Sequence, residues 1–222
     1  MQIVVQEFNE RVKEIESYLD FIRRVDTCEM LLAKSATHDP AYTLVEQQDL
    51  LRTFKASALL MLYNLMESSV TNAVEAIFDE LEQQAIPFDQ CREEIRIVVL
   101  GNIRRHEPRK LSPEIAALAT DIISKTFRRE TIVSGNVDAR EIREVAKRYG
   151  FPEPQSRGDR LLTVKTHRND LAHGSKSFAE VGRSFAVEDI IEIKNDVVAY
   201  LRETLDHVAG YLHGRSYVAS TS

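Results

Sequence analysis

Arg168 and His173 are the two residues of this sequence whose types and spacing could do chemistry together. An arginine guanidinium is permanently charged and offers a fork of donors to phosphate oxygens, while a histidine imidazole exchanges a proton near neutral pH. An arginine and a histidine five positions apart can therefore carry phosphoryl-transfer chemistry. Asp170 is the nearest acid, and the surrounding stretch is rich in basic side chains, namely Lys165, His167, Arg168 and His173.

The spacing by itself is weak evidence, because the sequence holds a second pair with the same separation, Arg202 and His207. That pair lies in the middle of an expected helix, where a step of five residues turns two side chains about 140° apart. The first pair differs because Gly174 follows it and predicts the end of a helix. A helix end can bring His173 round toward Arg168, so this pair is the candidate site.

The composition is that of a globular and mostly helical protein. Hydrophobic residues make up 43% of the 222 residues and charged residues 29%, with only 8 glycines and 6 prolines. Cys28 and Cys91 have no spacing for a metal site or a disulfide framework, and we expect no metal and no cofactor. The chain opens without a secretory signal pattern and has no apolar run long enough to cross a bilayer, so we expect a cytoplasmic protein.

Charge is unevenly distributed along the chain. The net charge is -6, which argues against indiscriminate binding of nucleic acid. Residues 1–85 hold 7 basic and 15 acidic residues, whereas residues 92–148 hold 13 basic and 9 acidic residues. A local basic face on an acidic protein is one interpretation, and ordinary solvated helix faces are the other.

Periodic apolar residues predict an all-α protein without a confident strand. The two longest expected helices are amphipathic and joined by a short connection, so they should form an antiparallel hairpin. We expect a single domain over 1–222, a helical bundle built on this hairpin and a C-terminal helix, with a more basic helical insertion at about 86–157 and a tail at 214–222. The expected helices cover about 2–33, 44–84, 91–100, 114–127, 138–149, 159–172 and 187–212.

Arg168 occupies an apolar stripe of the helix expected at 159–172, in line with Leu161, Val164 and Leu171. An arginine that points toward a core or an interface must meet an anion, because an unpaired buried guanidinium is costly. The sequence leaves two partners open. One is a structural carboxylate such as Glu67, and the other is a phosphate of a ligand.

The wider sequence resembles a HEPN domain, an all-helical family of ribonucleases and RNA-binding modules. The family motif is an arginine followed by a polar residue and, four to six residues after the arginine, by a histidine, and Arg168-Asn-Asp-Leu-Ala-His173 matches it. Segments 61–67, 134–140 and 177–182 look like one prokaryotic HEPN branch, associated with toxin–antitoxin and phage-defence loci. The resemblance covers about 40–213. Ser175 stands where one toxin group has a tyrosine, so the regulation of that group is not carried over.

The resemblance implies metal-independent cleavage of RNA, in which the ribose 2′-OH attacks the adjacent phosphate. His173 would act as general base or acid, and Arg168 would neutralise charge on the phosphate. Asn169 and Asp170 would orient His173 or hold the phosphate. Weaker candidates for substrate binding are Lys165, His167, Asn64 and Glu67, although His167 is also interpreted as an exposed neighbour.

The partners that the resemblance implies are RNA, a second copy of the chain and a cognate antitoxin protein. We expect no association with a membrane. Two Arg–His motifs would face each other across a dimer cleft. A different interpretation is a non-catalytic HEPN-like helical module that binds RNA or a protein, with Arg168 structural or ligand-binding. A third interpretation is an antitoxin-like partner of some other toxin.

Overall fold

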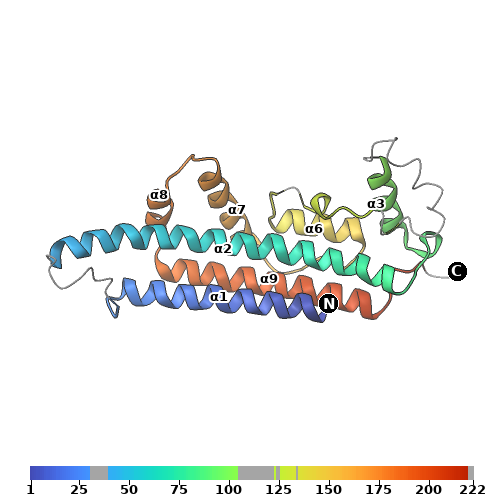
Figure 1. Cartoon of the computed structure of the whole chain (residues 1–222), viewed down its shortest axis with the longest axis horizontal. Helices are drawn as coiled ribbons and strands as arrows, with labels where there is room; N and C mark the ends of the chain where they lie inside the picture. The colour runs from blue at the N-terminus through green and yellow to red at the C-terminus, as the bar shows by residue number, and fades with distance from the viewer. Residues whose placement is uncertain (31–39, 105–122, 124–125, 134, 220–222) are drawn as a thin grey trace. The chain divides into compact units, whose positions relative to one another are not determined.

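The structure is a computed structural model that describes residues 1–30, 40–104, 123, 126–133 and 135–219 (Figure 1). The described residues form α-helices and short 3₁₀ turns, and no strand apart from a single bridge between Cys91 and Val218. The predicted all-α class is confirmed. Within this part of the chain, none of the helices combines the length and the apolar character that crossing a membrane requires.

The chain folds into two compact units. The first, here called the motif unit, comprises residues 6–66 and 157–200 and contains the Arg–His motif. The second unit comprises residues 1–5, 67–156 and 201–222. Helices α2 (Pro40–Gln83) and α9 (Val187–His213) each contribute one part to each unit. The expectation of a single domain over 1–222 stays a prediction.

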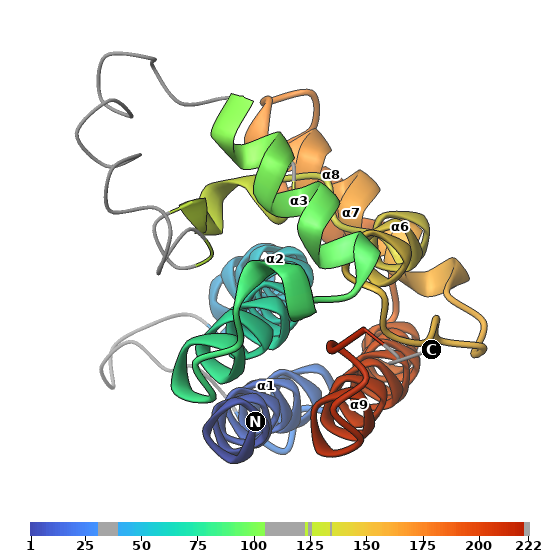
Figure 2. The same cartoon turned by 90° about the vertical axis from the view of Figure 1, so that its right-hand side faces the viewer.

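Three helical segments lie side by side in the motif unit, from α1 (Gln2–Asp26), α2 and α9 (Figures 1 and 2). The hydroxyl of Tyr18 donates to the carbonyl oxygen of Phe54 at 3.2 Å, and Gln47 Nε2 donates to the carbonyl oxygen of Val25 at 3.2 Å. Residues further along α1 therefore contact residues earlier in α2, so the two helices are antiparallel. The apolar stripe of α1 is buried, through Phe8, Val12, Ile15, Leu19, Ile22 and Val25.

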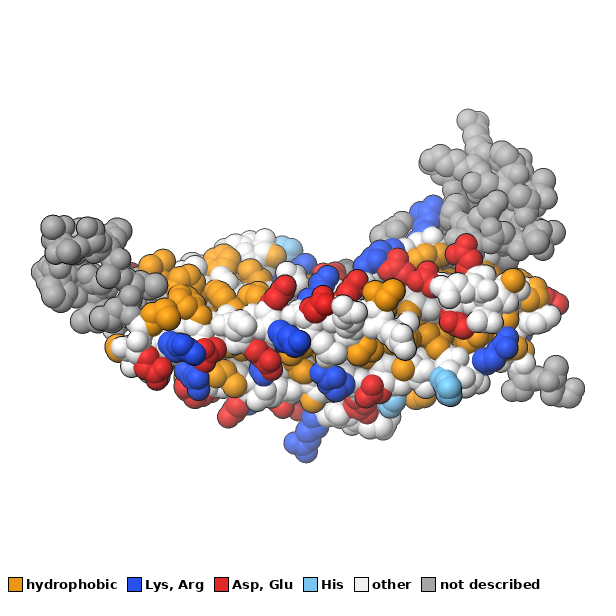
Figure 3. All heavy atoms as spheres, turned by 60° about the horizontal axis from the view of Figure 1, so that its bottom comes forward, with side chains coloured by type: hydrophobic (Ala, Val, Ile, Leu, Met, Phe, Trp, Pro, Cys, Tyr) orange, Lys and Arg blue, Asp and Glu red, His pale blue; other side chains and the backbone are white. Residues whose placement is uncertain are grey.

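The outer surface of α1 carries charges of both signs. Asp20 accepts from Arg23 at 2.7 Å and from Arg24 at 2.8 Å, one helical turn away. On the face drawn in Figure 3, acidic and basic side chains are interspersed over the helices.

Helices α7 (Asp159–Ala172) and α8 (Phe178–Arg183) complete the motif unit. Helix α7 buries Leu161 and Val164, as its apolar stripe predicts. Helix α8 approaches α2 so closely that a Cβ built on Gly182 would lie 1.8 Å from the carbonyl oxygen of Arg52. Lys55 Nζ strengthens this junction by donating to the carbonyl oxygen of Phe185 at 2.6 Å.

The second unit packs α3 (Glu93–Arg104) against α6 (Ala139–Tyr149), beside the short turns η1 (Phe88–Gln90) and η2 (Arg129–Thr131). Arg92 links segments of the second unit that are distant in sequence. The guanidinium of Arg92 pairs with Glu94 at 2.7 Å and donates to the carbonyl oxygen of Gly150 at 2.7 Å. The same guanidinium lies 5.8 Å from the ring centroid of Tyr211. These contacts are structural and lie outside the motif unit.

Three helix ends differ from the prediction by four residues or more, and one of them is the start of α2, at Pro40 instead of near 44. Helix α1 ends at Asp26 instead of near 33, because Cys28 adopts a left-handed backbone (φ 58°) and the Met30 amide turns back to the carbonyl of Arg24. Helix α3 continues past Gly101 to Arg104, since a helix tolerates a glycine where nothing requires a turn. Most of the helix expected at 114–127, and Ser134 of segment 134–140, lie outside the described residues.

Candidate functional site

The Arg–His motif occupies the C-terminal end of α7, as predicted. His173 is the cap residue, and Gly174 follows in the left-handed conformation with φ 68°. The Gly174 amide donates to the carbonyl of Leu171, and the Ser175 amide donates to the carbonyl of Asp170 at 2.9 Å. This pair of bonds is a Schellman ending, which glycine favours because it adopts positive φ without steric cost. The ending leaves the side chain of His173 exposed.

The guanidinium of Arg168 lies over the ring of Tyr63, 4.5 Å from its centroid. Tyr63 is only 1% exposed, so the ring is a fixed platform supplied by α2. Arg168 Nη1 also donates to Asn169 Oδ1 at 3.0 Å. Within the described part of the motif unit, no carboxylate forms an ion pair with Arg168. An aromatic face therefore supports the guanidinium while its positive charge remains available.

Asp170 is engaged by lysine. Its Oδ2 accepts from Lys176 Nζ at 2.7 Å and lies 3.7 Å from His167 Nδ1. The hydrogen bond from Lys176, together with the charges of Lys176 and His167, holds the pKa of Asp170 below its usual value of 3.8 against the opposing effect of burial. The carboxylate is therefore ionised at neutral pH and bound to a lysine that the motif does not contain.

His167 is mostly buried, whereas the sequence predicted an exposed neighbour. Its side chain is 17% exposed and packs edge-to-face against the ring of Phe185, with the centroids 5.0 Å apart. Its Nδ1 is buried without a hydrogen-bond partner among the described residues. Burial lowers the pKa of His167, the positive charge of Lys176 lowers it further, and Asp170 opposes both. His167 is therefore a neutral packing residue at pH 7.

His167 should make the protein less stable in weak acid. Its folded-state pKa lies below the ordinary value of 6.5, so the unfolded chain takes up a proton first as the pH falls. The contribution is fully favourable above about pH 6.5 and is lost as the pH falls through the lower, folded pKa. Urea unfolding at pH 7 and pH 5 should therefore show a smaller acid loss for His167→Gln than for the parent. A ring that titrates at or above 6.5 by NMR would contradict this expectation.

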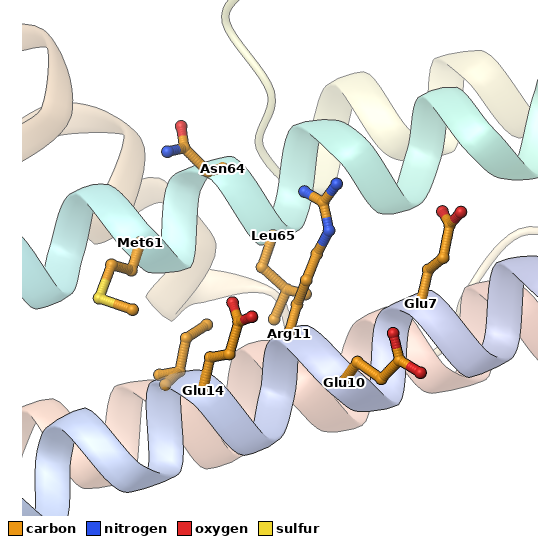
Figure 4. A pocket seen from close by; sticks show the side chains of 8 residues that line it. Glu7, Glu10, Arg11, Glu14, Met61, Asn64 and Leu65 are labelled. Carbon is orange, nitrogen blue, oxygen red and sulfur yellow. The ribbon is translucent and has the colours of Figure 1, made fainter.

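Asn64 opens onto a separate pocket between α1 and α2, with a volume of about 460 Å³. Figure 4 shows Asn64 on α2 and Arg11 reaching across from α1. None of the described residues that line this pocket belongs to α7. The rest of its lining comes from α1 and α2: Glu7, Glu10, Arg11, Glu14, Ile15, Met61 and Leu65.

The two remaining candidates for substrate binding are Lys165 and Glu67. Lys165 is half-buried on α7, one turn before Arg168. Glu67 is half-buried on α2 and belongs to the second unit. The structure thus gathers Arg168, Asn169, Asp170 and His173 at one helix end, and it places Asn64 on another surface of the motif unit.

Two residues that contact the motif, Tyr63 and Lys176, were not assigned a role from sequence. Tyr63 lies on α2, and only its place in segment 61–67 connected it with the family. Lys176 follows Asp170 by six residues and lies beyond the helix, where helical spacing no longer indicates neighbours. The search for a metal site adds no candidate residue. The described residues contain no group of three or more His, Cys, Asp or Glu that could hold a metal ion.

A helical bundle with an Arg-x4-His motif at the end of a helix is the arrangement of a HEPN domain. The chain matches the family described as MAE_28990-like HEPN over residues 2–217, and it belongs to that family. The expected HEPN membership is confirmed. No curated protein matches the chain, and no solved structure matches it either.

Proposed function

We propose that this HEPN protein is a metal-independent endoribonuclease whose site combines Arg168 and His173. The observation that carries the proposal is the guanidinium of Arg168, which rests on a buried ring, lies five residues before an exposed histidine and is not neutralised by a described carboxylate of its unit. We further propose that the enzyme is a homodimeric toxin or defence effector restrained by an antitoxin protein. Family membership supports the general class, in which nucleases are common.

In the proposed reaction the ribose 2′-OH of RNA attacks the adjacent phosphorus. His173 accepts the 2′-OH proton as the new P–O bond forms, and the P–O5′ bond breaks. The leaving oxygen takes a proton and departs as a 5′-OH, leaving a 2′,3′-cyclic phosphate. One histidine serves one of these two proton transfers at a time. A second copy of the motif would supply the other, which is the chemical reason for proposing a homodimer.

Arg168 suits the charge that develops on the phosphate. A guanidinium has five N–H donors, and Asn169 accepts from Nη1. The guanidinium carbon lies 4.5 Å from the ring centroid of Tyr63. A guanidinium that stacks on a ring keeps the N–H donors on its edge for phosphate oxygens. Preorganised donors of this kind contribute about 2.7–4 kcal/mol to transition-state stabilisation. In this proposal Asn169 keeps the guanidinium in place.

Incubation of the purified protein with single-stranded RNA in EDTA tests the reaction. We expect cleavage without added metal, and products that end in a 2′,3′-cyclic phosphate and a 5′-OH. Mass spectrometry of the fragments identifies both ends. Activity that rises with protein concentration and follows the dimer fraction, measured by light scattering, would support the shared cleft. Cleavage that needs a divalent metal, or that leaves a 3′-OH, would exclude this mechanism.

The second candidate is a non-catalytic module that binds RNA or a protein. It is favoured by the same stacking of Arg168 on Tyr63, because a guanidinium held against a buried ring can serve packing alone. In that case the protein would bind RNA or its partner without cutting RNA. The toxin role is tested separately by expressing the chain alone in bacteria, where growth arrest is expected and would also exclude the antitoxin interpretation.

A further inference from the structure

The connection between α7 and α8 is tied back to a single residue of the motif. The carbonyl oxygen of Asp170 accepts from the amides of Ser175 at 2.9 Å and of Lys176 at 3.3 Å. The carboxylate of Asp170 accepts from Lys176 Nζ at 2.7 Å. Backbone and side chain of Asp170 thus hold the same short segment, which begins directly after His173.

The far end of this connection is also fixed. Ser177 caps α8 by accepting from the amide of Glu180 at 3.2 Å, while the carboxylate of Glu180 accepts from the amide of Ser177 at 2.8 Å. This reciprocal pair is a capping box. Residues 174–176 are therefore restrained at both ends, and the restraint on the side of His173 depends on Asp170 and Lys176.

The ion pair between Asp170 and Lys176 is expected to contribute little to the stability of the fold. The side chain of Lys176 is 46% exposed, and pairs this exposed contribute little to folding because water and salt screen them. Catalysis requires a more accurate placement of side chains than folding does, since a displacement of about 1 Å in a reacting group can cost about 100-fold in rate. An exposed histidine at a helix end has few neighbours of its own to hold it, so its backbone must be fixed by the segment that follows.

We propose that Lys176 and Asp170 are positioning residues, which fix the backbone at His173 for the reaction. This inference rests on the proposed endoribonuclease function. It assigns Asp170 to the ion pair with Lys176 and leaves contact with the phosphate to Arg168. Lys176 acts through Asp170, and Asp170 acts through the helix end that presents His173.

The test compares Lys176→Met with Lys176→Arg in RNA cleavage. We expect Lys176→Met to lower kcat about 10-fold to 100-fold with KM changed less than about twofold, because the substrate still binds while His173 is misplaced. Lys176→Arg should restore most of kcat by reforming the ion pair. Lys147→Met is the matched control, since Lys147 pairs with Glu144 at 3.4 Å in the second unit and should leave cleavage unchanged.

Three outcomes would overturn the inference while the proposed function stands. An unchanged kcat would show that the pair does not position His173. A raised KM with unchanged kcat and a weaker dependence of binding on salt would show that Lys176 contacts RNA phosphate directly. Combining Asp170→Asn with Lys176→Met should lower kcat no further than either change alone, because both remove one ion pair. A fully additive loss would also contradict the inference.

Amide hydrogen exchange separates this inference from the proposed function. Lys176→Met should speed exchange at the amide of Ser175, whose acceptor is Asp170, and this is measurable by NMR without any catalysis. A parent protein that cuts no RNA would overturn the proposed function. The exchange rates would then still decide whether Asp170 and Lys176 restrain residues 174–176. An unchanged exchange rate at the Ser175 amide would show that they do not.

Discussion

His173→Ala is expected to slow RNA cleavage by about 10²–10⁴-fold, the usual contribution of a general acid or base. Its stability should hardly change, because His173 is exposed and its backbone (φ -90°, ψ -1°) suits alanine. Single-turnover cleavage in EDTA measures the first effect, and urea unfolding measures the second. A large loss of rate in a protein of unchanged stability would place His173 in the chemistry.

The sequence supplies its own control for this experiment. His207 has the same spacing from Arg202 that His173 has from Arg168. It lies in mid-helix on α9, in the second unit, with Nδ1 3.0 Å from the carbonyl oxygen of Pro152. His207→Ala should cleave RNA at the parent rate. Equal activity of His173→Ala and His207→Ala would show that the motif is not catalytic.

Arg168→Ala gives the complementary measurement. Under the proposed function it should lose about 10²–10³-fold in rate, as when one donor to a developing oxyanion is removed. Loss of the contact with Tyr63 should cost only about 0.5–2 kcal/mol of stability. A sharp fall in Tm with RNA binding retained would instead assign Arg168 to structure.

Gly182→Ala is expected to have the largest effect on stability. The new methyl carbon would lie 1.8 Å from the carbonyl oxygen of Arg52, and that neighbour is backbone that cannot swing away. Helices α8 and α2 would have to separate, so we expect at least about 3 kcal/mol of destabilisation. For a chain of this length the loss corresponds to roughly 6–12 °C in Tm.

Gly210→Ala is the matched control for Gly182→Ala. Gly210 is exposed on α9, and a Cβ there would meet no atom within 4 Å. The change should stabilise the protein by about 0.5–1 kcal/mol, because alanine loses less conformational freedom in a helix. Urea unfolding of both variants compares the two glycines directly. Similar effects of the two changes would mean that α8 does not approach α2 as closely as the structure indicates.

The sequence by itself determined most of the helices and the end of the motif helix, but it did not predict α8, where a loop was expected. The buried stripe of α1 is the one that its apolar periodicity predicts, and α6 begins after the Asp138 cap and ends at Gly150. The motif helix runs from Asp159 to Ala172, the predicted range. These features follow from local signals, since apolar period, caps and glycines act on their own neighbours. The HEPN resemblance rested on equally local motifs.

Only the tertiary structure decided what surrounds the motif. The contact of Arg168 with Tyr63 joins residues more than a hundred positions apart, and the burial of His167 against Phe185 depends on how α7 meets the connection between α8 and α9. Asn64 faces another pocket although it follows Tyr63 directly, because consecutive helical residues point about 100° apart. Such neighbours depend on how helices pack, and a linear pattern of residue types does not specify which side chains meet.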